Sequence, residues 1–339
     1  MKVLLLLIAF WAGTPSNQPT PATTAVAKGA QWLASVQGRD GGWGQDGGET
    51  SYIRQGEHLE SNGNDVANTA VAALALRRAG KQYQPNVDRA VDFILQNIEN
   101  SPQEGLGVTR LNGTQIQRKL GPFIDTFLSS MLLSEIDGTM RTSTENTRVR
   151  KALERCVAKI EKNQQSDGSW NIVGGWAPVL GTSMASRSLD VAKKKGVTVE
   201  DRVMNRADSY TKTAIAQPAA QAAAGVGLYQ SAQALEQLTR TEKDRKANAP
   251  QIAAIRSQLA NPRFVDGFGS MGGEEFFSYL NISDSLRRTG GEEWTKWQAQ
   301  ITDRILKLQN EDGTWAGHHC ITGRVATTSA AILNLTVDQ

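Results

Sequence analysis

Three histidines and a cysteine are the residues of this chain best suited to metal or nucleophile chemistry. His58 lies in an early polar segment, whereas His318, His319 and Cys320 are consecutive in a segment near the other end of the chain. Imidazole and thiolate groups are good ligands for zinc or copper, and a metal held by three such groups keeps a position open for water. The same residues also suit a nucleophile, Cys320, with His318 or His319 as its base. A third interpretation is a polar rim, in which the histidines only cap helices.

Carboxylates at the starts of predicted helices form a second group. Asp65 and Asp125 begin two helices rich in small or apolar residues, and Glu274 and Glu275 begin a third. A pair of carboxylates can act as acid and base in glycoside hydrolysis, and Asp65 with Glu274 or Glu275 would form that pair. Carboxylates at helix N-termini are also favoured by the helix dipole without any catalytic role. The candidate catalytic residues are therefore Asp65, Glu275 and Cys320.

A repeated turn defines the elements that position these residues. The pattern Gln-x-x-Asp-Gly-x-Trp occurs three times, and each copy closes an amphipathic helix. Asp-Gly supplies a tight turn, the Trp ring can pack on the preceding helix, and the Gln amide can bond free backbone groups at the helix end. We therefore interpret the motif as architectural. Its members are Gln37, Asp40, Trp43, Gln164, Asp167, Trp170, Gln309, Asp312 and Trp315.

Two kinds of predicted helix alternate along the chain. The first kind is amphipathic, whereas the second is crowded with Ala, Ser and Thr, which allow neighbouring helices to approach closely. The first kind is predicted at 25–37, 86–100, 148–165, 200–217, 251–260 and 295–309. The second kind is predicted at 64–78, 122–136, 181–195, 219–238, 274–288 and 323–335. The resulting helix pairs recur about every fifty residues, which lies within the range of repeat proteins.

Six such pairs predict an all-α fold, an α/α toroid that forms a single domain over residues 25–339. The amphipathic helices would form an outer ring, and the small-residue helices an inner ring with their N-terminal ends at one mouth. Because the first and sixth pairs are then neighbours, His58 would approach the His318–Cys320 segment. We therefore expect a ligand, either a small molecule or a peptide, to bind at this mouth, with a zinc or copper ion as the candidate cofactor.

Charge and the N-terminal segment bear on partners and location. The chain has 339 residues and a formal net charge of +3, which gives no reason to expect nucleic acid. Residues 1–16 resemble a secretory signal, because one Lys precedes an apolar run too short to span a membrane. Residues 17–24 are predicted to be a Pro- and Thr-rich linker. We expect an exported protein, periplasmic or extracellular, that contacts a membrane only through this signal if it stays uncleaved. Cys156, on the apolar face of a helix, is predicted to be a packed core thiol.

The three turns resemble the QW repeats of the squalene-hopene and oxidosqualene cyclases and of the related prenyltransferase repeat. The resemblance covers residues 25–338 and implies an α/α toroid, in agreement with the six helix pairs. The stretch 314–335 also resembles secreted bacterial proteins that carry this repeat.

The three turns imply the fold of that superfamily but not its catalytic chemistry. Cyclases that begin by protonation use an Asp-x-Asp-Asp motif, and those that ionise a diphosphate use Asp-rich metal motifs; neither occurs in this sequence. Protein prenyltransferase β subunits hold zinc with Asp, Cys and His, but their Asp-x-Cys element has no counterpart. We therefore expect a ligand-binding toroid without carbocation cyclase activity. A metal-dependent or Cys–His enzyme, and an isoprenoid- or glycan-active enzyme, stay open as alternatives.

Overall fold

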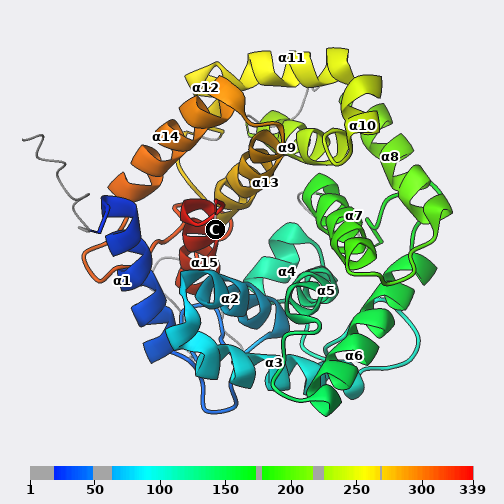
Figure 1. Cartoon of the computed structure of the whole chain (residues 1–339), viewed down its shortest axis with the longest axis vertical. Helices are drawn as coiled ribbons and strands as arrows, with labels where there is room; N and C mark the ends of the chain where they lie inside the picture. Colours follow the sequence, from blue (N-terminus) through cyan, green and yellow to red (C-terminus); the bar gives the residue numbers. More distant parts are fainter. Residues whose placement is uncertain (1–18, 49–62, 173–177, 217–224, 268, 339) are drawn as a thin grey trace, which may run out of the picture.

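The computed structural model describes residues 19–48, 63–172, 178–216, 225–267 and 269–338 (Figure 1). The predicted signal at 1–16, part of the predicted linker and His58 lie outside these residues. The described part of the chain is helical, and its only β-type pairings are the isolated bridges Trp43–Asp65 and Gly44–Gly47.

The helices form two concentric rings joined by short connecting helices (Figure 1). The outer ring contains α1 (Pro21–Ser35), α3 (Gln84–Glu99), α6 (Ser143–Lys162), α8 (Asp201–Ala216), α11 (Ala249–Leu259) and α14 (Gly291–Lys307). The inner ring contains α2 (Val66–Ala79), α5 (Ile124–Ile136), α7 (Pro178–Lys194), α9 (Val226–Leu238), α13 (Gly273–Thr289) and α15 (Arg324–Leu335). The short helices are η1 (Lys81–Tyr83), α4 (Gln115–Leu120), α10 (Glu242–Ala247) and α12 (Pro262–Val265).

The inner ring is closed. Each inner helix packs against the next one in chain order, and the last, α15, packs against the first, α2, and against α13. Helix α1 also lies against α15, so the two ends of the described chain meet (Figure 1). The predicted α/α toroid of six outer–inner pairs is therefore confirmed.

Residue composition explains why some helices lie in the inner ring and others in the outer ring. On α2, every residue from Val66 to Leu76 is buried, and small side chains let helices α1, α3, α5 and α15 approach it closely. The outer helix α6 buries one stripe, which includes Leu153 and Cys156, and exposes charged residues on its other face. Cys156 is fully buried, as predicted for a core thiol. Burial of apolar side chains on both sides of the inner ring supplies the main stabilising free energy.

The three Gln-x-x-Asp-Gly-x-Trp turns make the same set of contacts. Each Asp carboxylate accepts a hydrogen bond from the backbone N–H two residues later, and each Trp ring donates to a carbonyl in the outer helix that it has just left. Each Trp backbone N–H donates to a Thr hydroxyl on the following inner helix, the three acceptors being Thr69, Thr182 and Thr328. The motif therefore joins one outer helix to its inner partner.

The glutamine of each turn extends this connection to the next outer helix. Besides bonding within its own turn, the Gln side-chain amide donates to a carbonyl near the start of the following outer helix. The pairs are Gln37 with Asn86, Gln164 with Val203 and Gln309 with Ala25. The third pair links α14 to α1 and thus closes the outer ring.

Several helices begin earlier than the apolar pattern predicted. Helix α1 starts at Pro21, inside the predicted linker, because the Thr20 hydroxyl accepts from the Thr23 N–H and Pro occupies the first turn. Helix α6 starts at Ser143, where Thr142 and Glu145 form a capping box. Polar first turns stabilised by such caps carry no apolar stripe, so periodicity alone misses them. Among the described helices, none is both long and apolar enough to cross a bilayer.

Candidate functional site at the mouth of the toroid

The mouth consists of the N-terminal ends of the inner helices and the described loop residues that precede them. Two groups of buried carboxylates lie there, one at the start of α13 and one at the starts of α2 and α5. Burial without full compensation raises a carboxyl pKa, so these groups differ from ordinary surface acids.

Glu274 occupies the first turn of α13 and is fully buried. Its Oε2 atom accepts a hydrogen bond of 3.1 Å from the Ile321 N–H, while Oε1 accepts no N–H or O–H bond in the described part of the chain. Burial raises the pKa of Glu274 to about 7, against the lowering effect of its backbone hydrogen bonds. A buried carboxylate oxygen without a partner is uncommon and calls for an explanation.

His319 and Cys320 approach Glu274 from the loop before α15. One ligand atom from each of these three residues lies within 4.8 Å of the others. Burial raises the pKa of the Cys320 thiol to about 11, and the neighbouring Glu274 adds to this effect. A thiol with a raised pKa is a weak nucleophile, so the geometry does not favour the Cys–His nucleophile interpretation.

Glu275 holds the other side of this cluster. Its Oε1 accepts a 2.7 Å bond from the Tyr229 hydroxyl, and its Oε2 accepts a 2.8 Å bond from the Gly272 N–H. The same Oε2 lies 3.4 Å from His319 Nε2, which is also 2.9 Å from the Ser270 carbonyl oxygen. Burial, with the nearby glutamates, raises the pKa of Tyr229, so its hydroxyl remains a donor.

Gly272 permits the close approach of the two loops. A Cβ atom at this position would lie 2.6 Å from the His319 carbonyl oxygen and 2.9 Å from Glu274 Oε2. The His318 N–H donates a 2.7 Å bond to the Met271 carbonyl, and the Gly273 N–H donates to the Ile321 carbonyl. Any larger residue at position 272 would therefore separate the start of α13 from the loop before α15.

Asp65 and Asp125 form the second buried carboxylate group. Asp65 caps α2 and accepts bonds of 2.8 Å from the backbone and side chain of Asn68, while Asp125 accepts from the Ala67 N–H and from the Gln117 amide. Burial raises the pKa of Asp65 to about 7, with a further contribution from Asp125, and burial raises that of Asp125 to about 6. The two aspartates can therefore hold a proton near neutral pH.

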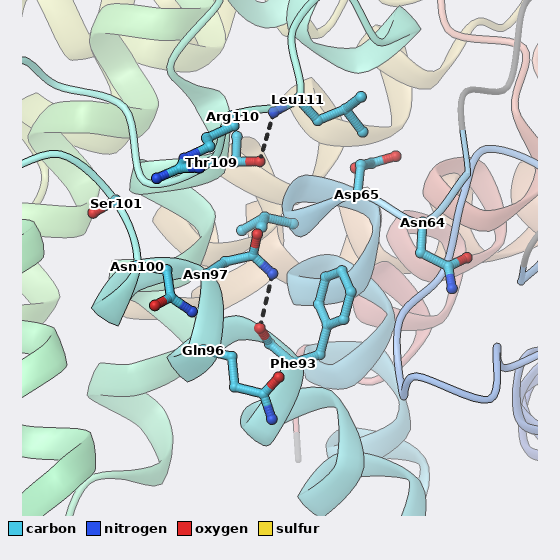
Figure 2. A pocket seen from close by; sticks show the side chains of 11 residues that line it. Asn64, Asp65, Phe93, Gln96, Asn97, Asn100, Ser101, Thr109, Arg110 and Leu111 are labelled. Carbon is cyan, nitrogen blue, oxygen red and sulfur yellow. Dashed lines mark hydrogen bonds between the residues drawn. The ribbon is translucent and has the colours of Figure 1, made fainter.

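A pocket of about 450 Å³ opens beside Asp65 (Figure 2). Its residues come from the start of α2, the last turns of α3 and the loop that follows α3, and they are mainly polar. The lining consists of Asn64, Asp65, Val66, Phe93, Gln96, Asn97, Asn100, Ser101, Thr109, Arg110 and Leu111. Four of these side chains are amides and one is aromatic, so the pocket offers mainly hydrogen-bonding groups.

Comparison with known proteins identifies relatives of part of this chain. A family model for the squalene-hopene cyclase C-terminal domain matches residues 9–109. The squalene–hopene cyclase of Bradyrhizobium diazoefficiens is 40% identical over 70 residues, which cover 21% of this chain and 10% of that enzyme. The probable squalene–hopene cyclase of Sinorhizobium fredii is 36% identical over 69 residues, which cover 20% of this chain and 10% of that enzyme. The match thus spans about a tenth of each relative.

Two solved structures have a similar fold over nearly the whole chain. A variant of the type II terpene cyclase MstE from Scytonema, in complex with its product merosterolic acid A, superimposes with a TM-score of 0.58 at 10% identity, covering 94% of this chain and 96% of that one. The apo enzyme gives a TM-score of 0.56 at 12% identity, covering 94% and 98% of the two chains. The chain therefore has the α/α-toroid fold of these terpene cyclases, and part of its sequence resembles squalene-hopene cyclases. At such low identity, the structural likeness establishes the fold alone.

Within this cyclase-like toroid, the predicted metal ligands occupy different places. His319 and Cys320 come together with Glu274, a residue that the sequence does not predict to be a ligand. His318 has an exposed side chain and is not part of that group, and His58 lies outside the described residues. The glycine pair Gly272-Gly273, just before Glu274 and Glu275, could have indicated that another segment packs closely against the start of this helix, because glycines permit close backbone approach.

The members of the predicted carboxylate pair, Asp65 with Glu274 or Glu275, lie at the starts of different inner helices. Asp65 interacts with Asp125 and with residues of α2, whereas Glu274 and Glu275 lie on α13. In the inner ring α15 stands between α2 and α13, so the two carboxylate groups belong to helices that are not neighbours. The sequence places all of these acids at helix starts but does not say which starts are adjacent.

Proposed function

We propose that this toroid binds a polar ligand at its mouth, in the pocket beside Asp65, and does not carry out carbocation cyclisation. The observation that carries the proposal is the pocket lining, in which four amides outnumber the single aromatic ring of Phe93. Amide groups donate and accept hydrogen bonds, so they suit a ligand with several hydroxyl or amide groups. A cavity that shields a carbocation would instead be apolar and rich in aromatic rings.

The charges around the pocket favour a neutral or weakly charged ligand. Asp65 offers a carboxyl whose pKa is raised to about 7 by burial, and Arg110 offers an exposed guanidinium on the opposite loop. The amides of Gln96 and Asn100 are exposed at the end of α3 and can contact a ligand without rearrangement. An oligosaccharide or another polyhydroxylated molecule has this pattern of groups.

A binding screen with a matched pair of variants tests this proposal. Saccharides and other polyhydroxylated compounds are screened by calorimetry and by thermal shift against the parent chain. Gln96→Leu combined with Asn100→Leu removes two amides from exposed positions, so the fold is expected to survive while binding is lost. Gln300→Leu, exposed on α14, serves as the control and should bind like the parent. Equal binding by all three proteins would contradict the assignment of the pocket.

Two enzyme assays complete the test. Incubation with squalene or a geranylgeranyl-bearing substrate should give no cyclised product, and a cyclised product would refute the proposal. Incubation with the bound saccharide should release no shorter product, because the Asp65 and Glu274 groups sit on helices that are not neighbours. Release of a cleaved product would instead show that the protein is a glycan-active enzyme.

We also propose that the protein is exported. The motivation is the apolar run in residues 1–16, which resembles a secretory signal. Cell fractionation and N-terminal sequencing of the mature chain test this proposal. An intact Met1 in a cytoplasmic fraction would contradict it.

A further inference from the structure

We propose that Glu274, His319 and Cys320 form a binding site for a zinc-type divalent metal ion at the seam between α13 and α15. One oxygen, one nitrogen and one sulfur atom from these residues lie within 4.8 Å of one another, so small side-chain adjustments would bring all three to a single ion. Carboxylate, imidazole and thiolate are the three ligand types that tetrahedral zinc sites use. This site is separate from the polar pocket beside Asp65 and does not depend on the binding function proposed for that pocket.

An unsatisfied atom supports the assignment independently of the spacing. Glu274 is fully buried, and its Oε1 accepts no N–H or O–H hydrogen bond in the described part of the chain. Its other oxygen is already bonded to the Ile321 N–H, so the carboxylate orientation is fixed. A cation at the free oxygen would compensate the burial of this acid, which is otherwise costly.

The surroundings of His319 indicate which ring nitrogen faces the metal. Nε2 lies 2.9 Å from the Ser270 carbonyl oxygen, which can only accept, so Nε2 carries the proton. Nδ1 is then the unprotonated nitrogen and is available as the ligand. A metal-bound histidine commonly donates its other N–H to a carbonyl or carboxylate, and Ser270 and Glu275 provide both.

A second group of residues holds this arrangement in place. Glu275, 3.4 Å from His319 Nε2, is anchored by the Tyr229 hydroxyl and by the Gly272 N–H. Cys320 has a φ of 51°, the only positive φ of a non-glycine residue among those described, and its backbone conformation helps to direct the thiol toward Glu274. Such a conformation is unfavourable for a residue with a Cβ atom unless other contacts compensate it.

Three protein ligands leave a fourth position for water or for a ligand atom. This coordination is typical of catalytic zinc rather than structural zinc. Binding forms a metal–sulfur bond and breaks the Cys320 S–H bond, and the proton passes to solvent.

The test uses the full chain, stripped with a chelator and titrated with Zn²⁺ and with Co²⁺. One ion per chain is expected, and bound Co²⁺ should show a thiolate-to-metal charge-transfer absorption band that only a cysteine ligand produces. Cys320→Gly removes the sulfur and accepts the positive φ without strain, so its fold is expected to remain intact. Its affinity for Zn²⁺ should fall by about 100-fold or more, beyond the 10–100-fold typical of outer-shell changes.

Two further variants make the result decisive. Glu275→Gln should weaken Zn²⁺ binding by about 10-fold or more through the orientation of His319. His318→Ala changes an exposed neighbour that is not in the group and should titrate like the parent. Absence of stoichiometric metal, a Co²⁺ complex without the thiolate band, or unchanged affinity in Cys320→Gly would each overturn the proposal. Loss of metal binding here would leave saccharide binding at Gln96 and Asn100 unaffected, so the two proposals fail separately.

Discussion

The side-chain amide of Gln309 donates a 2.9 Å hydrogen bond to the backbone carbonyl of Ala25, on the first helix of the chain. The equivalent glutamines, Gln37 and Gln164, bond to the outer helix that follows them in the sequence. Only the third copy must reach back across nearly the whole chain to find its acceptor. One repeated contact therefore connects successive outer helices and also closes the ring.

Gln309→Ala should loosen α1 more than any other helix. The lost bonds are expected to cost about 1–2 kcal/mol of unfolding free energy, because the carbonyls of Ala25 on α1 and of Gly313 in the turn each lose one donor. Hydrogen exchange followed by mass spectrometry should show faster exchange in 21–35 than in the parent. Gln300→Ala, at an exposed position of α14, is the control, and equal protection of α1 in both variants would argue against a ring-closing role.

Trp315→Ala should be more damaging than Gln309→Ala. The Trp315 ring is fully buried, its Nε1–H donates to the Ile305 carbonyl, and it contacts α1 near Gly29. Loss of so large a buried ring is expected to cost about 3–5 kcal/mol, as measured by urea unfolding. Trp294→Ala removes a partly buried ring from the same outer helix, α14, and should cost clearly less. Equal losses for the two variants would show that the turn has no special packing role.

The fold could be predicted from the sequence because its determinants are local and repeated. Three copies of the Gln-x-x-Asp-Gly-x-Trp turn and two alternating helix compositions indicate six helix pairs, and six pairs of this kind close into a ring. The first residues of several helices could not be predicted accurately. Thr20 and Thr142 begin their helices with side-chain caps and polar first turns, which leave no apolar periodicity to detect.

The candidate site was less predictable because it depends on adjacency between distant segments. The sequence identified His319 and Cys320 but could not show that Glu274 is the acid opposite them, since that requires knowing that α13 and α15 are neighbours. It also could not show that the acid beside Asp65 is Asp125, which starts another inner helix. Similar acids start several inner helices, and no local pattern distinguishes between them.

The Asp65–Asp125 pair should make the protein less stable as the pH rises toward neutrality. Burial raises the pKa of Asp65 from 3.8 to about 7 and that of Asp125 from 3.8 to about 6, so the folded state binds more protons than the unfolded state between these values. The free energy of unfolding should therefore fall from about pH 4 to about pH 7, by at most about 1.4 kcal/mol per pH unit for each proton.

Asp65→Asn should flatten this dependence. Asn remains a good N-cap, and Asn68 Oδ1, which has no partner in the described structure, can accept from the new amide after a flip. Urea unfolding at a series of pH values measures the slope for the parent and the variant. Asp303→Asn, exposed on α14, should keep the slope of the parent. A slope that survives Asp65→Asn unchanged would place the titrating group elsewhere.

Glu236 should give the opposite dependence at low pH. It is buried near the C-terminal end of α9, on a different face from the mouth, and its carboxylate bonds to Arg240, with Arg288 3.5 Å away. Burial alone would raise its pKa, but Arg240 and Arg288 outweigh that effect and lower it from 4.5 to about 2. Stability that depends on this carboxylate is present above about pH 4.5 and should be lost as the pH falls toward 2.

Glu236→Gln should reveal that contribution directly. Removal of the Glu236 charge leaves the buried Arg240 guanidinium with only the more distant Asp190, 3.9 Å away, as an ion-pair partner, and the expected cost is about 3–5 kcal/mol at pH 7. The variant should also lose the part of the acid sensitivity that arises between pH 4.5 and 2. Glu242→Gln is the matched control, because Glu242 forms an exposed pair with Lys246 four residues later on α10. Such a pair contributes about 0.3–0.5 kcal/mol, so a comparable loss in both variants would mean that the buried cluster does not stabilise the C-terminal ends of the inner helices.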